Sequence, residues 1–232
     1  MAQAIKVRNA EEAPPAPAFT AEWPKSLSDQ AYERLLDMIL SGELAGGTIL
    51  QERRLAEALN ISRTPTREAL ARLESEGLVT RQFGRLLTVR ELTVQEFIEI
   101  LNVRLLLEVE AARLAAGNVA KERTREVRAA IRALINAPTP TAAQHWAVDD
   151  MVHGLVAEAS GHDMLVALIR DLRRRTHMFD MRRIPARFQD SCREHLALVD
   201  AVEKGDGEAA RKIAATHIEN VKLSIIDKLK IL

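Results

Sequence analysis

The chain has 232 residues, equal numbers of acidic and basic side chains, and only 3% aromatic residues. This length can bury a core and predicts two domains, while the abundance of alanine, leucine, arginine and glutamate favours a mainly α-helical fold. A single cysteine, Cys192, excludes an internal disulfide; every long apolar run is broken by charge and no secretory segment is evident, so we expect a cytoplasmic protein that does not enter a membrane.

Residues 1–24 include a proline-rich run and are predicted to form a disordered tail without a function of their own.

Further along, Leu55, Ala58 and Leu59 place an apolar stripe on one short helix. Asn60 follows at a point where the backbone is expected to enter the left-handed region, which asparagine tolerates. The chain is therefore predicted to turn at Asn60.

A second helix is predicted to begin near Pro65, because proline suits the first turn of a helix and Thr64 has an N-capping side chain. Helical periodicity separates two faces of this segment. The inward face is predicted to hold Thr66, Ala69, Leu70 and Leu73, and the outward face Arg63, Arg67, Ala71 and Glu74.

The next segment, residues 78–89, has strand-like residues on both sides of Gly84 and is predicted to form a β-hairpin wing. Gly77 is expected to end the preceding helix. Residues 61–90 contain six arginines and three glutamates, a local charge of +3 in a neutral chain. Positive charge concentrated in this way indicates a nucleic-acid-binding surface.

Arg63 and Arg67 are the candidate base-reading residues, since arginine can donate two hydrogen bonds to guanine in the major groove. Phosphate or minor-groove contacts are expected from Arg53, Ser62, Thr64, Gly84 and Arg85. Any one of these arginines could instead be a solvated charge on a helix, so the prediction depends on the whole set.

The segment from Leu55 to Val79, which contains Ile61-Ser62-Arg63-Thr64-Pro65-Thr66-Arg67-Glu68-Ala69-Leu70, resembles the winged helix-turn-helix of the GntR family of bacterial transcription regulators. The resemblance covers about residues 27–90. It implies that residues 25–92 form the DNA-binding domain and that Arg53, Arg63, Arg67 and Gly84 touch operator DNA. Since helix-turn-helix proteins usually bind as dimers, we expect a homodimer on double-stranded operator DNA.

Residues 93–232 show long helical periodicity and are predicted to form an antiparallel all-helical bundle of about six helices. Glycine- or proline-containing breaks separate the predicted helices. The helices are expected near residues 93–117, 121–136, 141–160, 163–180, 186–204 and 207–229.

Four polar residues in this half fall on apolar stripes and are predicted to point inward. Asp149 and His153 lie one helical turn apart, while His195 and His217 each belong to a stripe of their own. Three imidazoles and a carboxylate suit a divalent transition metal. A single inward histidine is more often a hydrogen-bonded core residue, so the convergence of all four is what favours a metal site.

The same half resembles the C-terminal ligand-binding (FCD) domain of the FadR branch of the GntR family. The resemblance lies in Arg104-Leu105-Leu106-Leu107-Glu108, Asp149-Asp150-Met151-Val152-His153, Glu194-His195-Leu196-Ala197-Leu198-Val199 and His217-Ile218. It implies that Asp149, His153, His195 and His217 hold Zn²⁺, Ni²⁺ or a similar ion, and that the ion binds a small organic or sugar acid. It also implies that Arg104 clamps the far end of this effector, although Arg104 could equally form a surface ion pair with Glu108. Six helices resemble the VanR-like subgroup.

Together these features predict a transcription regulator rather than an enzyme, with repression released by a small carboxylate. Two alternatives stay open. A metal-dependent hydrolase could use the Asp and three His residues to activate water, although it would leave the DNA-reading segment unexplained. A DNA-binding protein with a purely structural metal would show no response to small acids.

Overall fold

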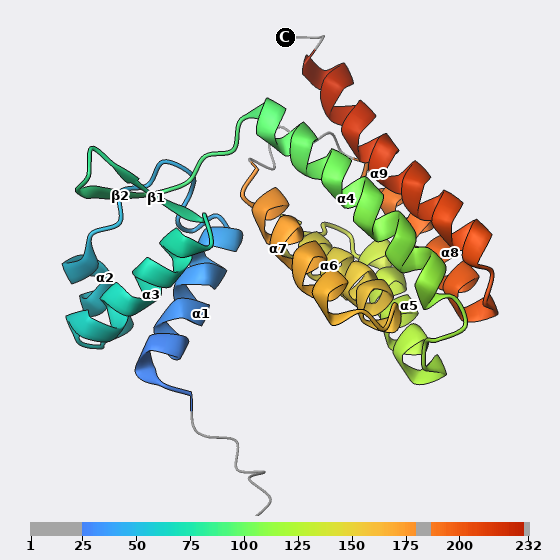
Figure 1. Cartoon of the computed structure of the whole chain (residues 1–232), viewed down its shortest axis with the longest axis horizontal. Helices are drawn as coiled ribbons and strands as arrows, with labels where there is room; N and C mark the ends of the chain where they lie inside the picture. Colours follow the sequence, from blue (N-terminus) through green and yellow to red (C-terminus); the bar gives the residue numbers. More distant parts are fainter. Residues whose placement is uncertain (1–24, 180–186, 230–232) are drawn as a thin grey trace, which may run out of the picture.

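The computed structural model describes residues 25–179 and 187–229, which are mainly helical and include one small antiparallel sheet (Figure 1). The tail predicted at residues 1–24 lies outside the described residues, as does the end of the helix predicted at 163–180. None of the described helices is long and apolar enough to cross a membrane.

The N-terminal part consists of three helices followed by a two-stranded wing. The elements are α1 (Leu27–Leu40), α2 (Glu52–Leu59), α3 (Arg63–Ser75), β1 (Val79–Gln82) and β2 (Leu86–Val89). Helix α1 starts at a Ser26 cap, whose hydroxyl accepts a hydrogen bond from the Asp29 amide, and packs against α3. Leu35 of α1 and Leu70 and Leu73 of α3 are almost completely buried in the resulting core.

The predicted turn at Asn60 is confirmed, because this residue has φ 54° and ψ 44° and ends α2. The predicted start of α3 is wrong by two residues. The helix begins at Arg63 after Ser62, so Thr64 and Pro65 lie inside its first turn, where an amide needs no helical partner. Ala58 is exposed rather than on the buried stripe, and Ala56 is buried in its place.

The predicted wing is confirmed as an antiparallel pair in which Val79 lies opposite Val89 and Gln82 opposite Leu86. Phe83 and Gly84 form the tip, with φ values of 49° and 72°. Positive φ is ordinary for glycine and costly for phenylalanine, so the tip has a strained aromatic residue on a tight turn.

Within residues 93–179 and 187–229, the C-terminal part has six further helices, as predicted, each within a few residues of its expected bounds. Helices α4 and α9 make extensive contact with each other, and α6 contacts α4, α5, α7 and α8. The elements are α4 (Val94–Ala115), α5 (Lys121–Asn136), α6 (Ala142–Ala159), α7 (Asp163–His177), α8 (Phe188–Lys204) and α9 (Gly207–Leu229).

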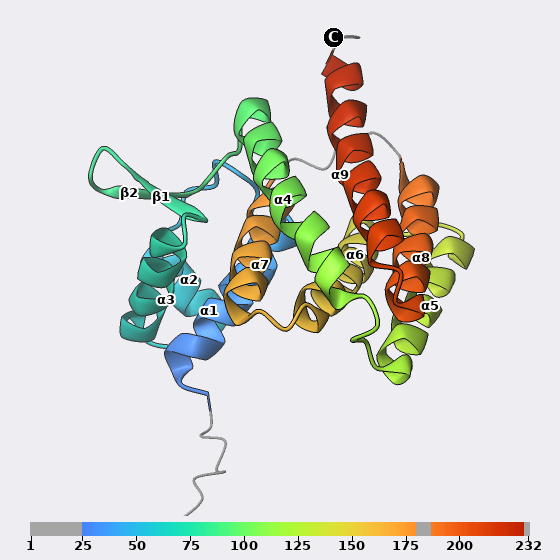
Figure 2. The same cartoon turned by 45° about the vertical axis from the view of Figure 1, so that its right-hand side comes forward.

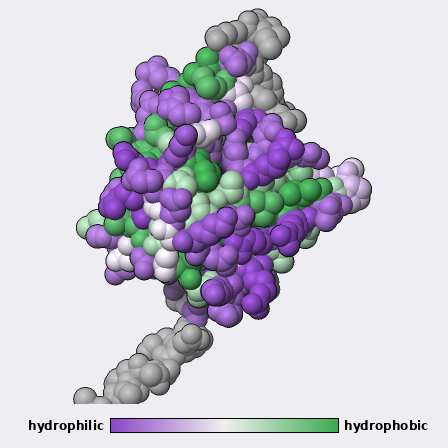
Figure 3. Space-filling model, turned by 90° about the vertical axis from the view of Figure 1, so that its right-hand side faces the viewer, coloured by the Kyte–Doolittle hydropathy of each residue, from purple (hydrophilic) through white to green (hydrophobic). Residues whose placement is uncertain are grey.

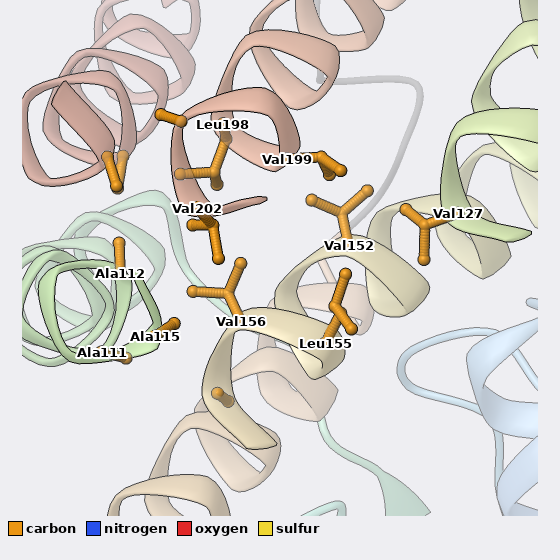
Figure 4. Close-up of a cluster of buried hydrophobic side chains, with 14 of the residues drawn as sticks. Ala111, Ala112, Ala115, Val127, Val152, Leu155, Val156, Leu198, Val199 and Val202 are labelled. Carbon is orange, nitrogen blue, oxygen red and sulfur yellow. The ribbon is translucent and has the colours of Figure 1, made fainter. Parts of the chain in front are cut away.

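A buried apolar cluster holds α6 against its neighbours (Figure 4). Val152 and Val156 of α6 face Val199 and Val202 of α8 in this cluster, and alanines of α4 close one side. Burying branched side chains on both helices fixes the faces that α6 and α8 turn toward each other. The polar residues on these same faces are positioned as a consequence.

Candidate metal centre and DNA-facing surface

Helix α6 supplies two of the four predicted metal-binding residues. A capping box between Thr141 and Gln144 fixes the start of the helix. Asp149 and His153 follow one turn apart, and both are more than nine-tenths buried. The remaining two residues, His195 of α8 and His217 of α9, are equally buried, so all four predicted side chains point into the bundle.

These four side chains converge. One ligand atom from each lies within 4.8 Å of the others. The His153 and His195 ring centroids are 5.3 Å apart, and those of His195 and His217 are 4.6 Å apart. The Nε2 atom of His195 lies 3.2 Å from Oδ1 of Asp149. Three helices thus bring a carboxylate and three imidazoles to one point.

Two further carboxylates orient the imidazoles from behind. Nδ1 of His153 contacts Glu108 of α4, and Nδ1 of His217 lies 2.7 Å from Oε2 of Glu194. When each Nδ1 donates its proton to the carboxylate, the Nε2 lone pair is left for a ligand. The Nε2 atom of His153 is buried and has no hydrogen-bond partner among the described residues, and that of His195 faces the Asp149 carboxylate.

Electrostatics favour the protonation states that a metal needs. Burial raises the pKa of Asp149, but the Arg173 guanidinium outweighs it and holds this pKa well below its usual range. Burial lowers the pKa of His153 to about 3, assisted by Arg173. An ionised carboxylate beside neutral imidazoles is the donor set that a divalent transition ion binds, so the residues fit such an ion.

Arg104, the predicted effector contact, is not at the surface. Its Nε donates to Oε1 of Glu108 at 2.6 Å, and its Nη1 donates to Oγ1 of Thr176 in α7 at 3.3 Å. The ion pair with Glu108 is therefore present but buried. Burial raises the pKa of Glu108, whereas Arg104 and His153 hold it well below its usual range. Arg104 keeps Glu108 charged behind His153.

Arg173 and His177 of α7 were missed by the sequence prediction. Nη2 of Arg173 donates to Asp149 at 2.5 Å and to Asp150 at 2.7 Å, and Nε2 of His177 lies 3.3 Å from Asp150. The one sequence signal was their spacing of one helical turn on α7. Their position against α6 depends on tertiary packing, which spacing does not reveal.

The predicted DNA-contacting residues are all exposed in the N-terminal part. Arg63 and Arg67 project from the first turns of α3, and both form ion pairs with Glu52 of α2, at 2.9 and 3.0 Å. Arg53, Ser62 and Arg63 line one hollow between α2 and the start of α3. The other predicted contacts, Thr64 on α3 and the wing residues Gly84 and Arg85, are exposed as well.

Phe83, at the tip of the wing, was also missed. Its side chain is 96% exposed between Gln82 and Gly84. An aromatic residue directly before the turn glycine of a basic hairpin is the signal that could have identified it. Behind the tip, Arg81 of β1 donates to Glu74 of α3 at 2.7 Å, which ties the wing to the helix that bears Arg63 and Arg67.

Comparisons with known proteins agree with this geometry. Residues 27–89 match the family model of bacterial regulatory proteins of the gntR family, and residues 99–220 match the FCD domain. The chain is 27% identical over 226 residues to an Escherichia coli K12 protein named as a regulator of the L-lactate dehydrogenase operon, covering 85% of this chain and 86% of that protein. It is also 27% identical to the HTH-type transcriptional regulator Mce2R of Mycobacterium tuberculosis over 225 residues, covering 87% and 92%.

A solved structure shows the same fold over nearly the whole chain. Escherichia coli McbR/YncC superposes with a TM-score of 0.75 at 24% identity, covering 89% of this chain and all of that one. At this identity the likeness concerns the arrangement of helices and the wing, and the chemistry of the site has to be argued from the residues themselves.

Proposed function

The chain belongs to the GntR family of bacterial regulatory proteins and carries an FCD domain, and we propose that it is a transcription repressor released by a small carboxylate. DNA-binding regulation, not catalysis, is what this family does. The single observation that carries the proposal is the convergence of Asp149, His153, His195 and His217 in the FCD bundle. The hydrolase alternative is not favoured, because it leaves the N-terminal half without a role.

In this proposal the four residues hold a divalent metal such as Zn²⁺ or Ni²⁺. When bound, the ion supplies positive charge that attracts the carboxylate of a small organic or sugar acid. Glu108 and Glu194 hold the imidazoles in place from behind. Arg104 stays a candidate contact for the acid, and direct clamping would require it to release Glu108 or Thr176.

For DNA, we assign base reading to Arg63 and Arg67 and backbone positioning to the other exposed residues of α2, α3 and the wing. Phe83 adds an apolar tip that can enter the minor groove beside Arg85. The residues assigned to positioning are Arg53, Ser62, Thr64, Gly84 and Arg85.

We assign the homodimer contact to α4 and α9. Val103 and Leu106 of α4 and Leu223 of α9 are large apolar residues with 45%, 73% and 50% exposure. Figure 3 shows the face at the right of Figure 1, where apolar patches interrupt a hydrophilic surface. A hollow between the two helices is lined by acidic and by basic side chains. In a two-fold dimer, the acidic side chains of one copy can therefore face the basic side chains of the other. Its charged lining residues are Glu110, Glu208, Arg211, Lys212 and Glu219.

The function is tested by operator binding of the zinc-loaded protein with and without a panel of small organic acids. We expect at least one monocarboxylic acid to lower operator affinity by roughly 5- to 150-fold, the range of ordinary allosteric coupling. Fluorescence anisotropy with a promoter fragment measures the change, and the same titration after zinc removal is the control. A purely structural metal would leave operator affinity unchanged by every acid.

Helix α7 lies between the rest of the C-terminal bundle and the N-terminal part (Figures 1 and 2), and its side chains contact both. On one side, Arg173 donates to Asp149, as described above. On the other, Nη1 of Arg174 donates to the Tyr32 hydroxyl at 3.1 Å, and this hydroxyl donates to Glu76 at 2.6 Å. Tyr32 belongs to α1, and Glu76 follows α3. A shift of α7 at the centre therefore reaches both helices that form the N-terminal core.

Replacing Arg174 with alanine is expected to leave operator affinity within about threefold of the unmodified protein while reducing the effector-dependent change severalfold. The physical reason is that the variant loses the hydrogen bond to Tyr32 without touching the metal centre or α3's outward face. Arg170→Ala is the matched control, because Arg170 lies on the same helix with 63% of its side chain exposed. Equal effector responses in the two variants would show that the contact from Arg174 to Tyr32 does not carry the effect of the acid to the N-terminal part.

A further inference from the structure

Beside the metal centre lies a second group of polar atoms that the proposed function does not use. Nη1 of Arg173 and Nε1 of Trp146 are buried, and no hydrogen-bond partner is present for them among the described residues. Arg173 is 4% exposed and His177 is 7% exposed. Buried donors without partners are uncommon in folded proteins, so such a group indicates a place where a bound molecule supplies the acceptors.

These atoms belong to one continuous cluster. Trp146 lies on α6 one turn before Asp150, and its ring centroid is 4.0 Å from that of His177 on α7. His177 and Arg173 share the Asp150 carboxylate, and Arg173 also donates to Asp149. The cluster therefore extends from the metal-binding carboxylate, through the Arg173 guanidinium, to the indole.

Arg173 has a buried nitrogen left for a ligand. Arg104 already donates through Nε to Glu108 and through Nη1 to Thr176. Arg173 donates through Nη2 to Asp149 and Asp150 and through Nε to Asp150, while its Nη1 has no partner in the described part of the chain. Guanidinium and indole nitrogens can only donate, so the group that satisfies them must present acceptor oxygens.

The charges around the centre determine how many negative charges the ligand should carry. Among the described residues, three arginines lie in or directly behind the centre together with four carboxylates, which leaves one excess negative charge in this set. These residues are Arg104, Arg173 and Arg187, and Glu108, Asp149, Asp150 and Glu194. A bound divalent ion would change the net charge of this set to one excess positive charge. A monocarboxylate would then neutralise the set, whereas a dicarboxylate would leave one excess negative charge.

We propose that the effector is a small monocarboxylic acid with an uncharged oxygen, such as a hydroxyl, at the end remote from its carboxylate. The carboxylate faces the metal centre, and the remote oxygen accepts hydrogen bonds from Trp146 and Arg173. This inference rests on the proposed function, since it names the class of acid that the centre binds. It makes Trp146 and Arg173 the residues that determine specificity.

The test uses the full-length chain with zinc as the metal and compares three series of acids of matched length. The probes are 3-hydroxypropanoate, 4-hydroxybutanoate and 5-hydroxypentanoate, the corresponding alkanoates, and the corresponding dicarboxylates. Tryptophan emission reports binding directly, because the chain has two tryptophans and Trp23→Phe leaves Trp146 alone. At the best length we expect the hydroxy acid to bind at least about tenfold more tightly than the alkanoate, and more tightly than the dicarboxylate.

Two conservative variants, followed by calorimetry, separate recognition from folding. Trp146→Phe keeps an aromatic ring beside His177 but removes the N–H, and Arg173→Lys keeps the positive charge but removes Nη1. Each should reduce the preference for the hydroxy acid to about threefold or less. For Trp146→Phe, which leaves the groups around Asp149 in place, alkanoate affinity should also stay nearly constant. Arg170→Lys, on the exposed side of α7, should retain the full preference.

Equal binding of hydroxy acid and alkanoate, a dicarboxylate that binds best, or a preference that survives both conservative variants would overturn the inference. So would zinc-loaded protein that binds none of the nine acids. Zinc content and operator affinity, measured on the same preparation, report on the proposed function separately. If zinc is absent, the metal assignment fails, and the same titrations of the metal-free protein still decide whether Trp146 and Arg173 select the remote oxygen.

Discussion

Replacing Arg67 with alanine is expected to lower affinity for the operator by roughly 5- to 150-fold, which corresponds to the loss of one bidentate contact with guanine, about 1–3 kcal/mol. Arg67 projects from an early turn of α3, and 66% of its side chain is exposed. Residues at this end of a recognition helix are the ones that reach base edges in the major groove. Affinity for unrelated DNA should fall much less, because base contacts carry the sequence information.

The ion pairs that Glu52 forms with Arg63 and Arg67 do not prevent this contact. Both arginines are about two-thirds exposed, and exposed pairs of this kind contribute only about 0–1 kcal/mol. A guanine edge or a phosphate can therefore replace the Glu52 carboxylate at little cost. In the free protein, Glu52 keeps the two guanidinium groups side by side on the outward face of α3.

Arg53→Ala is the matched control, because Arg53 lies on α2 in the same basic region and 78% of its side chain is exposed. A phosphate contact should weaken binding to all sequences alike and reduce the slope of log affinity against log salt by about one. Circular dichroism confirms that both variants are folded. If Arg67→Ala binds its operator as the unmodified protein does, Arg67 is not a base-reading residue.

The helices, the wing and the four inward polar residues were predictable from local signals. Periodicity shows which residues share a face, and Gly84 within strand-like sequence indicated the hairpin. Asp149 and His153 are one turn apart, so their common face followed from spacing alone. That His195 and His217 would meet them required the resemblance to a known domain, since periodicity gives the inward side of a helix but not its neighbour.

Contacts between distant parts of the chain were not predictable. The hydrogen bond from Arg174 to Tyr32 joins residues 142 positions apart, and no local pattern distinguishes Arg174 from other arginines on α7. The assignment of Thr64 as a helix cap failed for a local reason. Ser62, Thr64 and Pro65 are all compatible with the first turn of a helix, and the neighbouring Asn60 turn decides where α3 begins.

The double variant His195→Ala, His217→Ala is expected to lose the bound metal, and with it the stabilisation that the metal gives. An ion present at roughly 100 to 1,000 times its dissociation constant stabilises the folded state by about 3–4 kcal/mol, which for a chain of this size is roughly 10 °C in melting temperature. Chelation should therefore lower the melting temperature of the unmodified protein by roughly 10 °C and leave that of the double variant unchanged.

The comparison of chelated with metal-loaded protein separates metal loss from packing loss. Removing two buried imidazoles leaves cavities that lower stability with or without the ion, so the informative quantity is the shift caused by the chelator in each variant. His162→Ala is the control, since His162 is an exposed histidine at the start of α7 and outside the quartet, and it should keep the full shift. Elemental analysis gives the metal content independently. A double variant with one equivalent of metal would place the ion elsewhere, and the four converging side chains would then be a hydrogen-bonded polar core.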